Sequence, residues 1–136
     1  MASHYASLKP EVSVATAVRT LLEYHQSAAP VVDDQQKLVG VISEADCMRA
    51  TLVEGYYNEG VALVKDLMTA DPESVPADME LSKVTSAFLD NNRRMMPVCE
   101  EGSLVGILSR QDILNALVRE ADSQLHPDWE PKKDSG

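Results

Sequence analysis

Two serines are each followed, three positions later, by an aspartate: Ser43 with Asp46, and Ser109 with Asp112. A carboxylate in the first turn of a helix can accept charge-assisted hydrogen bonds from the two adjacent hydroxyls of a ribose. The serine hydroxyl and the backbone N–H groups at the start of such a helix can donate to a phosphate. Both Ser-x-x-Asp segments are therefore candidates for nucleotide contacts.

The same spacing also has a purely structural explanation. A serine with an acidic residue three positions on forms a capping box, in which the two side chains satisfy the free N–H groups at a helix start. In a single segment this explanation would be preferred, but here the pattern occurs twice beside similar flanking sequence. Helix capping and ligand contact therefore both stay open for these residues.

Basic side chains are scarce, so the adjacent pair Arg93 and Arg94 is notable. We expect one of them to approach a ligand phosphate in the site of the second copy, because the acidic surroundings provide no other attraction for an anion. The first copy has Gln26 and Ser27 at the matching positions, so its site should bind phosphate less well. The alternative is that both arginines are solvated and complement the negative end of a helix.

Arg110 lies inside the second Ser-x-x-Asp segment and is a further candidate for ligand contact. Its counterpart in the first segment is Glu44, which carries the opposite charge. The two sites are therefore expected to be unequal.

An internal repeat places these residues in equivalent surroundings. Residues 29–33 (APVVD) align with 96–100 (MPVCE), and residues 38–43 (LVGVIS) align with 104–109 (LVGILS). Such self-similarity predicts a duplicated structural unit. We expect both Ser-x-x-Asp segments to open onto a common cleft between the two copies.

Each copy also has the same expected order of elements. Apolar residues at helical spacing precede each proline, and they predict an amphipathic helix with Ser13, or Asp78 or Glu80, near its start. Two apolar runs joined by a short polar loop then predict a β-hairpin. A second helix is expected to begin at Ser43 and at Ser109.

The predicted fold class is α/β (α+β), with two tandem βαββα repeats related by a pseudo-twofold axis and packed through their sheets. Neither half buries enough surface to be comfortably stable alone. We assign residues 1–60 to the first repeat with a connector, 61–125 to the second repeat, and 126–136 to a polar tail that is predicted to be disordered. The first copy has only residues 1–10 as a lead-in, without the opening at 64–69 that precedes the second.

Composition limits the possible functions. The chain has 136 residues with a net charge of −10 and a pI near 4.6. One domain of this size excludes a multidomain enzyme. The negative surface argues against nucleic acid and against a membrane surface. No apolar stretch is long enough to cross a bilayer, so a cytoplasmic location is expected.

Catalytic and metal-binding patterns are missing from the sequence. There is no P-loop, Rossmann glycine pattern, nucleophile elbow or HExxH motif, so an enzyme is not expected. Cys47 and Cys99 are in no metal-like spacing, and we expect buried small apolar side chains rather than reactive thiols. No metal site and no required cofactor are predicted.

The duplicated order of helix, PVVD, LVGVIS and x-x-Asp resembles the cystathionine-β-synthase (CBS) domain, and two in tandem resemble a Bateman module. Residues 64–116 match the pattern nearly end to end, including KDLMT at 65–69, which resembles the usual DIMT opening. The resemblance implies a regulatory module that binds an adenosine-containing ligand (AMP, ADP, ATP or S-adenosylmethionine) between the copies.

The resemblance also implies which residues would hold the adenine. An apolar slot in the second copy would be lined by residues before and within the hairpin and by the lead-in: Met95, Met96, Pro97, Glu73, Ser74 and Val75. The corresponding residues of the first copy are Ala28, Ala29 and Pro30, with Leu8 and Pro10 from its lead-in. The simpler alternative is that these side chains only fill the core.

Members of this family commonly form disc-like dimers, so a homodimer is expected, together with an unknown regulated protein partner. Two other interpretations stay open. The chain could be a non-catalytic dimerisation or interaction module with empty or differently occupied clefts, which the missing lead-in of the first copy favours. It could instead bind a metal ion or a magnesium–nucleotide complex, because an anionic surface attracts divalent ions.

Overall fold

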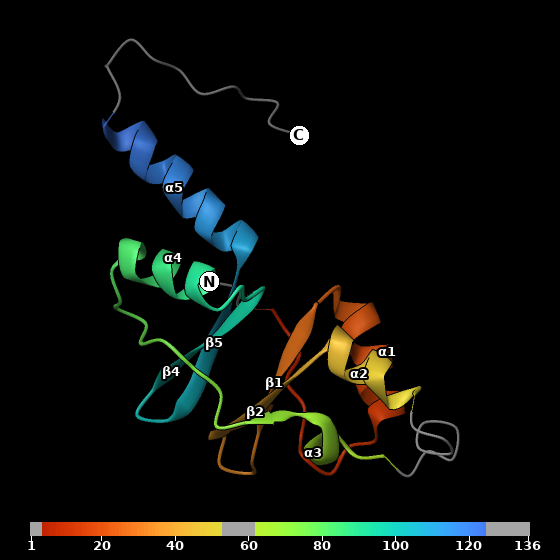
Figure 1. The fold of residues 1–136 in the computed structure, drawn as a ribbon. Coiled ribbons are helices and arrows are strands. Elements are labelled where there is room, and N and C mark those ends of the chain that lie inside the picture. The colour runs from red at the N-terminus through yellow and green to blue at the C-terminus, as the bar shows by residue number, and fades with distance from the viewer. Residues whose placement is uncertain (1–3, 53–61, 125–136) are drawn as a thin grey trace.

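The computed structural model describes residues 4–52 and 62–124. Figure 1 shows two halves side by side, each with a strand hairpin and its own helices. The expected disordered tail, Tyr56, Tyr57 and Trp129 lie outside the described residues. None of the helices described has the length and apolar character needed to cross a membrane.

The first half contains α1 (Val14–Tyr24), β1 (Ala28–Val32), β2 (Leu38–Ser43) and α2 (Glu44–Ala50). The Ser13 hydroxyl accepts a hydrogen bond from the backbone N–H of Thr16 at 3.1 Å, which confirms Ser13 as the N-cap of α1. The helix ends at His25, whose left-handed backbone (φ 55°) turns the chain into β1. Strands β1 and β2 pair antiparallel, as predicted for a hairpin.

The second half contains α4 (Leu81–Asp90), β4 (Met95–Glu100), β5 (Ser103–Ser109) and α5 (Arg110–Gln124). Glu80 is the N-cap of α4 but makes no capping hydrogen bond with its side chain. The predicted order of helix, hairpin and helix is confirmed in both halves. Even the irregularity in the pairing recurs at the same place, between Val31 and Val32 in β1 and between Val98 and Cys99 in β4.

The stretch of lead-in that meets each hairpin is equivalent in the two halves, although the helix and strand of the opening at 64–70 have no counterpart in residues 4–13. The Leu8 N–H donates to the Pro30 carbonyl at 2.9 Å, and the Leu8 carbonyl accepts from Val32 N–H at 2.9 Å. Val75 makes the same two hydrogen bonds with Pro97 and Cys99, each at 3.0 Å. Each lead-in is a single parallel bridge rather than a full strand. The first half therefore keeps the lead-in contact with its hairpin even without the opening.

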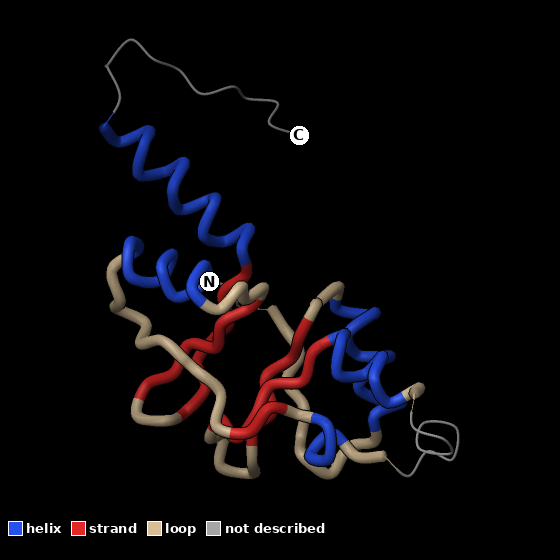
Figure 2. The backbone as a smooth tube through the Cα atoms, in the orientation of Figure 1, coloured by secondary structure: helices blue, strands red, loops and turns tan. Residues whose placement is uncertain are grey.

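The opening of the second copy crosses over to the first half. It forms the short helix α3 (Val64–Leu67) and strand β3 (Thr69–Ala70), and β3 pairs with β2. Figure 2 shows this segment beside the first hairpin. A Cβ added to Gly40 would collide with the Met68 sulfur, so the glycine permits the close approach. The predicted boundary at residue 60 divides the two repeats along the sequence. In space, however, residues 62–70 of the second repeat pack on the first repeat.

The two halves meet through their sheets, as predicted. Ala28 and Met95, which occupy equivalent repeat positions, are buried together with Ile107 in one cluster, against which Val41 packs. At the other end of the strands the hairpin turns are joined, since Leu38 N–H donates to Gly102 O at 3.1 Å and Leu104 N–H to Gln36 O at 3.0 Å. This end is closed by backbone hydrogen bonds, so an opening between the halves is left at the opposite end.

Candidate functional site

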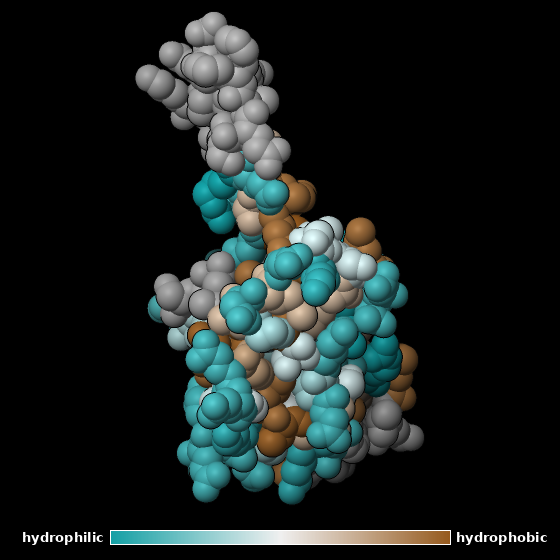
Figure 3. Space-filling view, turned by 90° about the vertical axis from the view of Figure 1, so that its left-hand side faces the viewer, coloured by the Kyte–Doolittle hydropathy of each residue, from teal (hydrophilic) through white to brown (hydrophobic). Residues whose placement is uncertain are grey.

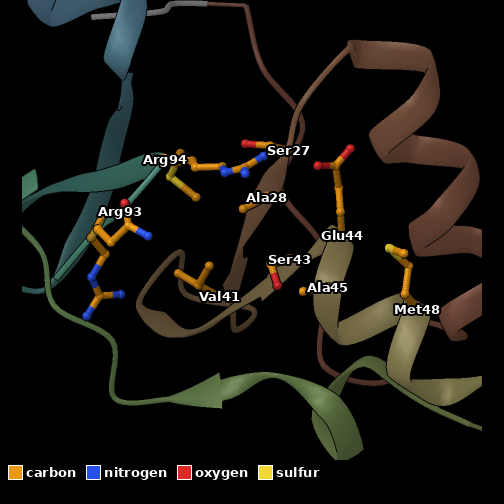
Figure 4. Close-up of a pocket in the computed structure, with 11 residues that line it drawn as sticks. Ser27, Ala28, Val41, Ser43, Glu44, Ala45, Met48, Arg93 and Arg94 are labelled. Carbon is orange, nitrogen blue, oxygen red and sulfur yellow. The ribbon is translucent and has the colours of Figure 1, made fainter. Parts of the chain in front are cut away.

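A cleft of about 410 Å³ lies between the halves, at the end of the sheets where α2 begins. Both halves contribute to it (Figure 4), and its lining consists of Ser27, Ala28, Val41, Ser43, Glu44, Ala45, Met48, Asn92, Arg93, Arg94 and Met95. The sequence predicts a separate site for each repeat, with Arg93, Arg94 and Met95 in the site of the second copy. The structure instead places these three residues in one cleft with Ser43 of the first copy.

The first-half wall is fixed by a capping box. The Asp46 backbone N–H donates to Ser43 Oγ at 3.1 Å, and the Ser43 backbone N–H donates to Asp46 Oδ2 at 2.9 Å. The second carboxylate oxygen, Oδ1, accepts from the Arg49 guanidinium at 2.8 Å. Ser43 lines the cleft, whereas Asp46 is outside the lining and its side chain is only 15% exposed. Each carboxylate oxygen has a further lone pair, so contact of Asp46 with ribose stays a prediction.

The second-half wall is the turn between α4 and β4. In Figure 4 the Arg94 side chain extends towards Ser27, while Arg93 points to the other side of the turn. Arg93 Nε lies 3.6 Å from Glu73 Oε1 of the lead-in, beyond hydrogen-bond distance and shielded from solvent. Arg94 is exposed. Of the basic pair, Arg94 is therefore the guanidinium available to a ligand in the cleft.

Opposite charges flank the cleft. The carboxylate of Glu44, the first residue of α2, extends from the first half, and Arg94 extends from the second (Figure 4). Ala28, Val41, Met48 and Met95 supply apolar surface between them. A slot of this kind accommodates a flat apolar ring with one polar end, because a few placed polar groups orient a ligand held by apolar contacts.

The second Ser-x-x-Asp segment is also a capping box. Ser109 N–H donates to Asp112 Oδ2 at 2.7 Å, and Asp112 N–H donates to Ser109 Oγ at 3.2 Å. Asp112 lines a different cavity of about 220 Å³ within the second half, beside Pro76 and Ile113. The expectation that both segments open onto one common cleft is therefore not met. The structural explanation, helix capping, applies to both segments.

The remaining predicted residues are not part of the cleft lining. Ala29, Pro30, Val75, Met96 and Pro97 are buried, with Ala29 and Met96 completely enclosed. Ser74 is exposed, and its side chain hydrogen-bonds to Cys99. Their roles as ligand contacts stay predictions.

Arg110 is engaged with the cleft wall rather than lining the cleft. Its Nε donates to the Arg93 carbonyl and its Nη2 to Asn92 Oδ1, both at 2.8 Å. Three further lining residues, Glu44, Met48 and Asn92, are not predicted from the sequence. The sequence does contain a pattern that could have identified Glu44 and Met48. They lie one and five residues after Ser43, which places them on the first two turns of α2.

The two cysteines differ in burial: Cys47 is buried as expected, whereas Cys99 is only partly buried. Burial, and then the neighbouring carboxylates of Asp46 and Glu44, raise the pKa of the buried Cys47 thiol. Burial also raises the pKa of Cys99, although the hydrogen bond with Ser74 lowers it in part. A raised thiol pKa keeps the sulfur protonated and weakly nucleophilic. Within the described residues, no group of three or more His, Cys, Asp and Glu side chains is placed to hold a metal ion.

Comparison with known proteins gives a family. The model of the CBS domain matches the chain twice, at residues 1–52 and 64–119. The crystal structure of CBSX2 in complex with AMP superposes with a TM-score of 0.78 at 30% identity, covering 87% of this chain and 90% of that one. CBSX2 is a CBS-pair protein from Arabidopsis thaliana.

Two archaeal proteins are similar in sequence. An uncharacterised 17.7 kDa protein of Acidianus ambivalens is 30% identical over 95% of this chain and 77% of its own length. The uncharacterised protein MJ1225 of Methanocaldococcus jannaschii is 31% identical over 86% of this chain, which spans only 41% of that protein.

A putative acetoin utilization protein (AcuB) from Vibrio cholerae, at 21% identity, shares the fold with a TM-score of 0.80 over 96% of this chain and 94% of that one.

Proposed function

The chain belongs to the CBS domain family, and from this premise we propose that it is a regulatory module that binds an adenosine-containing ligand in the cleft between its repeats. The candidates are AMP, ADP, ATP and S-adenosylmethionine. The AMP complex of CBSX2 supports this ligand class. No reaction is assigned to the chain.

The observation that carries the proposal is the composition of the cleft. Ser43 and Arg94 come from different repeats, yet both line it, with Val41 and Met95 between the repeats as apolar surface. Adenine would occupy the apolar part, and a phosphate would lie near the Arg94 guanidinium, which is planar and can donate two parallel hydrogen bonds to it.

A ligand that touches both walls would favour one relative arrangement of the repeats over others. The ligand can shift the equilibrium between two arrangements only by as much as its binding free energies to them differ. We infer that the ligand state is passed in this way to a regulated protein partner. The cytoplasmic location expected from the sequence remains part of this proposal.

Calorimetric titration of the chain with adenosine, AMP, ATP and S-adenosylmethionine, with and without magnesium, tests the proposal. We expect saturable binding of at least one of these ligands, with a Kd below about 1 mM, corresponding to roughly 4 kcal/mol. A magnesium requirement would favour the metal–nucleotide interpretation. Absence of binding for all four ligands in both conditions would contradict the proposal.

A second role, assembly into a homodimer, is favoured by a separate observation. Each half leaves apolar side chains exposed at equivalent positions on or just after its two helices: Leu22, Met48 and Leu52 in the first half, and Leu89, Leu114 and Val118 in the second. Figure 3 shows the side of the second repeat, where hydrophilic side chains surround smaller apolar areas. Leu22 and Met48 line one shallow groove together with Val18, and a contiguous exposed apolar area is typical of an interaction surface.

Multi-angle light scattering tests this second role. The expected result is a species of twice the chain mass of 14.9 kDa, and Leu22→Ser with Leu89→Ser should shift it to the monomer. Thr20→Ser, also on α1, serves as the control. A monomer at all concentrations would exclude the homodimer and leave ligand binding to be judged separately.

A further inference from the structure

We propose that Arg110 is a positioning residue for the cleft: it fixes the turn at residues 91–94, so that Arg94 faces the ligand. This inference rests on the proposed binding of a phosphate-bearing adenosine ligand. It assigns Arg110 no contact with that ligand. Arg110 belongs to the Ser-x-x-Asp segment of the second repeat. The cleft that it supports is lined by Ser43, from the Ser-x-x-Asp segment of the first repeat.

The contacts of Arg110 hold two consecutive residues of the turn. Its Nε–H donates to the Arg93 carbonyl and its Nη2–H to Asn92 Oδ1, both at 2.8 Å. Asn92 has a left-handed backbone (φ 49°), a conformation that asparagine tolerates because its short polar side chain can bond locally. One rigid guanidinium therefore fixes both a backbone carbonyl and a side chain.

The turn is held from its other side as well. Asn91 Nδ2 donates to Glu73 Oε1 at 3.1 Å, and the same oxygen is 3.6 Å from Arg93 Nε. The Arg93 N–H donates to the Phe88 carbonyl at 2.9 Å. With Asn91, Asn92 and Arg93 each held, the direction of the following residue, Arg94, is set by the turn. Figure 4 shows the result, with Arg93 turned away and Arg94 directed towards Ser27.

The first repeat holds its equivalent turn in a different way. Glu44 occupies the position of Arg110, and its side chain lacks the guanidinium N–H groups that hold the turn in the second repeat. Instead Gln26 is bound to the lead-in, accepting from Ala6 N–H at 2.7 Å and donating to the Ala6 carbonyl at 3.2 Å. The arginine-held turn with a cation facing the cleft is therefore a property of the second repeat, within the part of the chain that the structure describes.

Arg110→Gln, measured against AMP and adenosine, separates positioning from general damage. We expect AMP affinity to fall roughly fivefold to tenfold, the range for loss of a charged hydrogen-bonding anchor, while adenosine affinity changes less than about twofold. Arg110→Lys should behave like Arg110→Gln, because an ammonium cannot hold both partners in the same planar geometry. Arg19→Gln, which removes an exposed arginine from α1, is the charge-matched control and should leave both affinities unchanged.

A double-mutant cycle distinguishes positioning from direct contact. In an Arg94→Gln background, Arg110→Gln should reduce AMP affinity by less than about twofold, because the group that it positions is already absent. An additive loss would show that Arg110 acts on the ligand independently of Arg94 and would overturn the proposal. Equal losses for AMP and adenosine, or an unchanged AMP affinity, would also overturn it.

The anchor itself can be tested without a ligand. Limited trypsin digestion should cleave after Arg93 and Arg94 faster in Arg110→Gln than in the wild type or in Arg19→Gln, because a turn that opens more often is cut more often. Unchanged cleavage rates would overturn the proposal. If the wild type binds neither adenosine nor AMP, the proposed function fails, and the digestion result still decides whether Arg110 holds the turn.

Discussion

Ser43 of the first repeat and Arg94 of the second repeat line the same cleft. The hydroxyl belongs to the cap of α2, and the guanidinium follows a turn that is held by contacts from β5–α5 and from the lead-in. A ligand that contacts both must therefore respond to the relative position of the two halves. Under the proposed function, ligand binding would therefore be coupled to the arrangement of the repeats.

The orientation of the basic pair gives the first prediction. Arg94→Gln should weaken AMP binding by about tenfold, equivalent to roughly 1.4 kcal/mol, because a charge-assisted contact with the phosphate is lost. Arg93→Gln is the matched control and should change the affinity less than about threefold, since Arg93 is turned towards Glu73. Calorimetry measures both. A larger loss for Arg93→Gln would contradict the assignment of Arg94.

The charge of Glu44 gives a second prediction. Glu44→Gln should raise the affinity for AMP severalfold and that for ATP more strongly, because a carboxylate at the cleft repels each added phosphate charge. The gain should shrink with added salt. Glu23→Gln, an exposed acid of α1, is the control and should have little effect. If ATP gains no more than AMP does, the carboxylate is not near the phosphates.

The capping boxes give a third prediction, about stability. Asp46→Ala should lower the free energy of unfolding by about 1 to 2 kcal/mol, since it removes hydrogen bonds with both Ser43 and Arg49. Asp112→Ala should cost about 1 kcal/mol. Urea denaturation checks both values. Asp78→Ala, in the exposed loop before α4, should be nearly neutral, and equal effects for all three variants would argue against the caps.

The thiol of Cys47 gives a prediction for alkaline pH. Because its pKa is raised in the folded state, the folded protein holds the thiol proton more tightly than the unfolded chain does. The stabilisation is complete below the ordinary thiol pKa of about 8.5 and is lost as pH rises through the raised value.

Urea denaturation from pH 7 to pH 10 should therefore show a falling free energy of unfolding above about pH 8.5, and Cys47→Ala should reduce the slope of that fall. Cys99 and Tyr5 also have raised pKa values, so part of the slope should remain. An unchanged slope in Cys47→Ala would assign the whole effect to the other groups.

Local sequence was enough to predict the elements and the caps. The helical spacing from Val14 to Leu22, the hairpins around the Pro and Gly of each copy, and the starts at Ser43 and Ser109 all depend on interactions within a few residues. The duplicated order of these elements also predicted the family and the packing of the sheets, because each half has an apolar face that it cannot bury alone.

The grouping of the candidate residues was decided by tertiary structure. The sequence assigned Arg94 to the site of its own repeat, but packing of the two sheets places it beside Ser43, while Asp112 lines another cavity. Likewise, β3 joins the first sheet and α3 packs beside it, although both open the second repeat. The position of a residue within its repeat can be read from the order of residues. Contacts between repeats depend on how two surfaces pack together, and no short stretch of sequence predicts that packing.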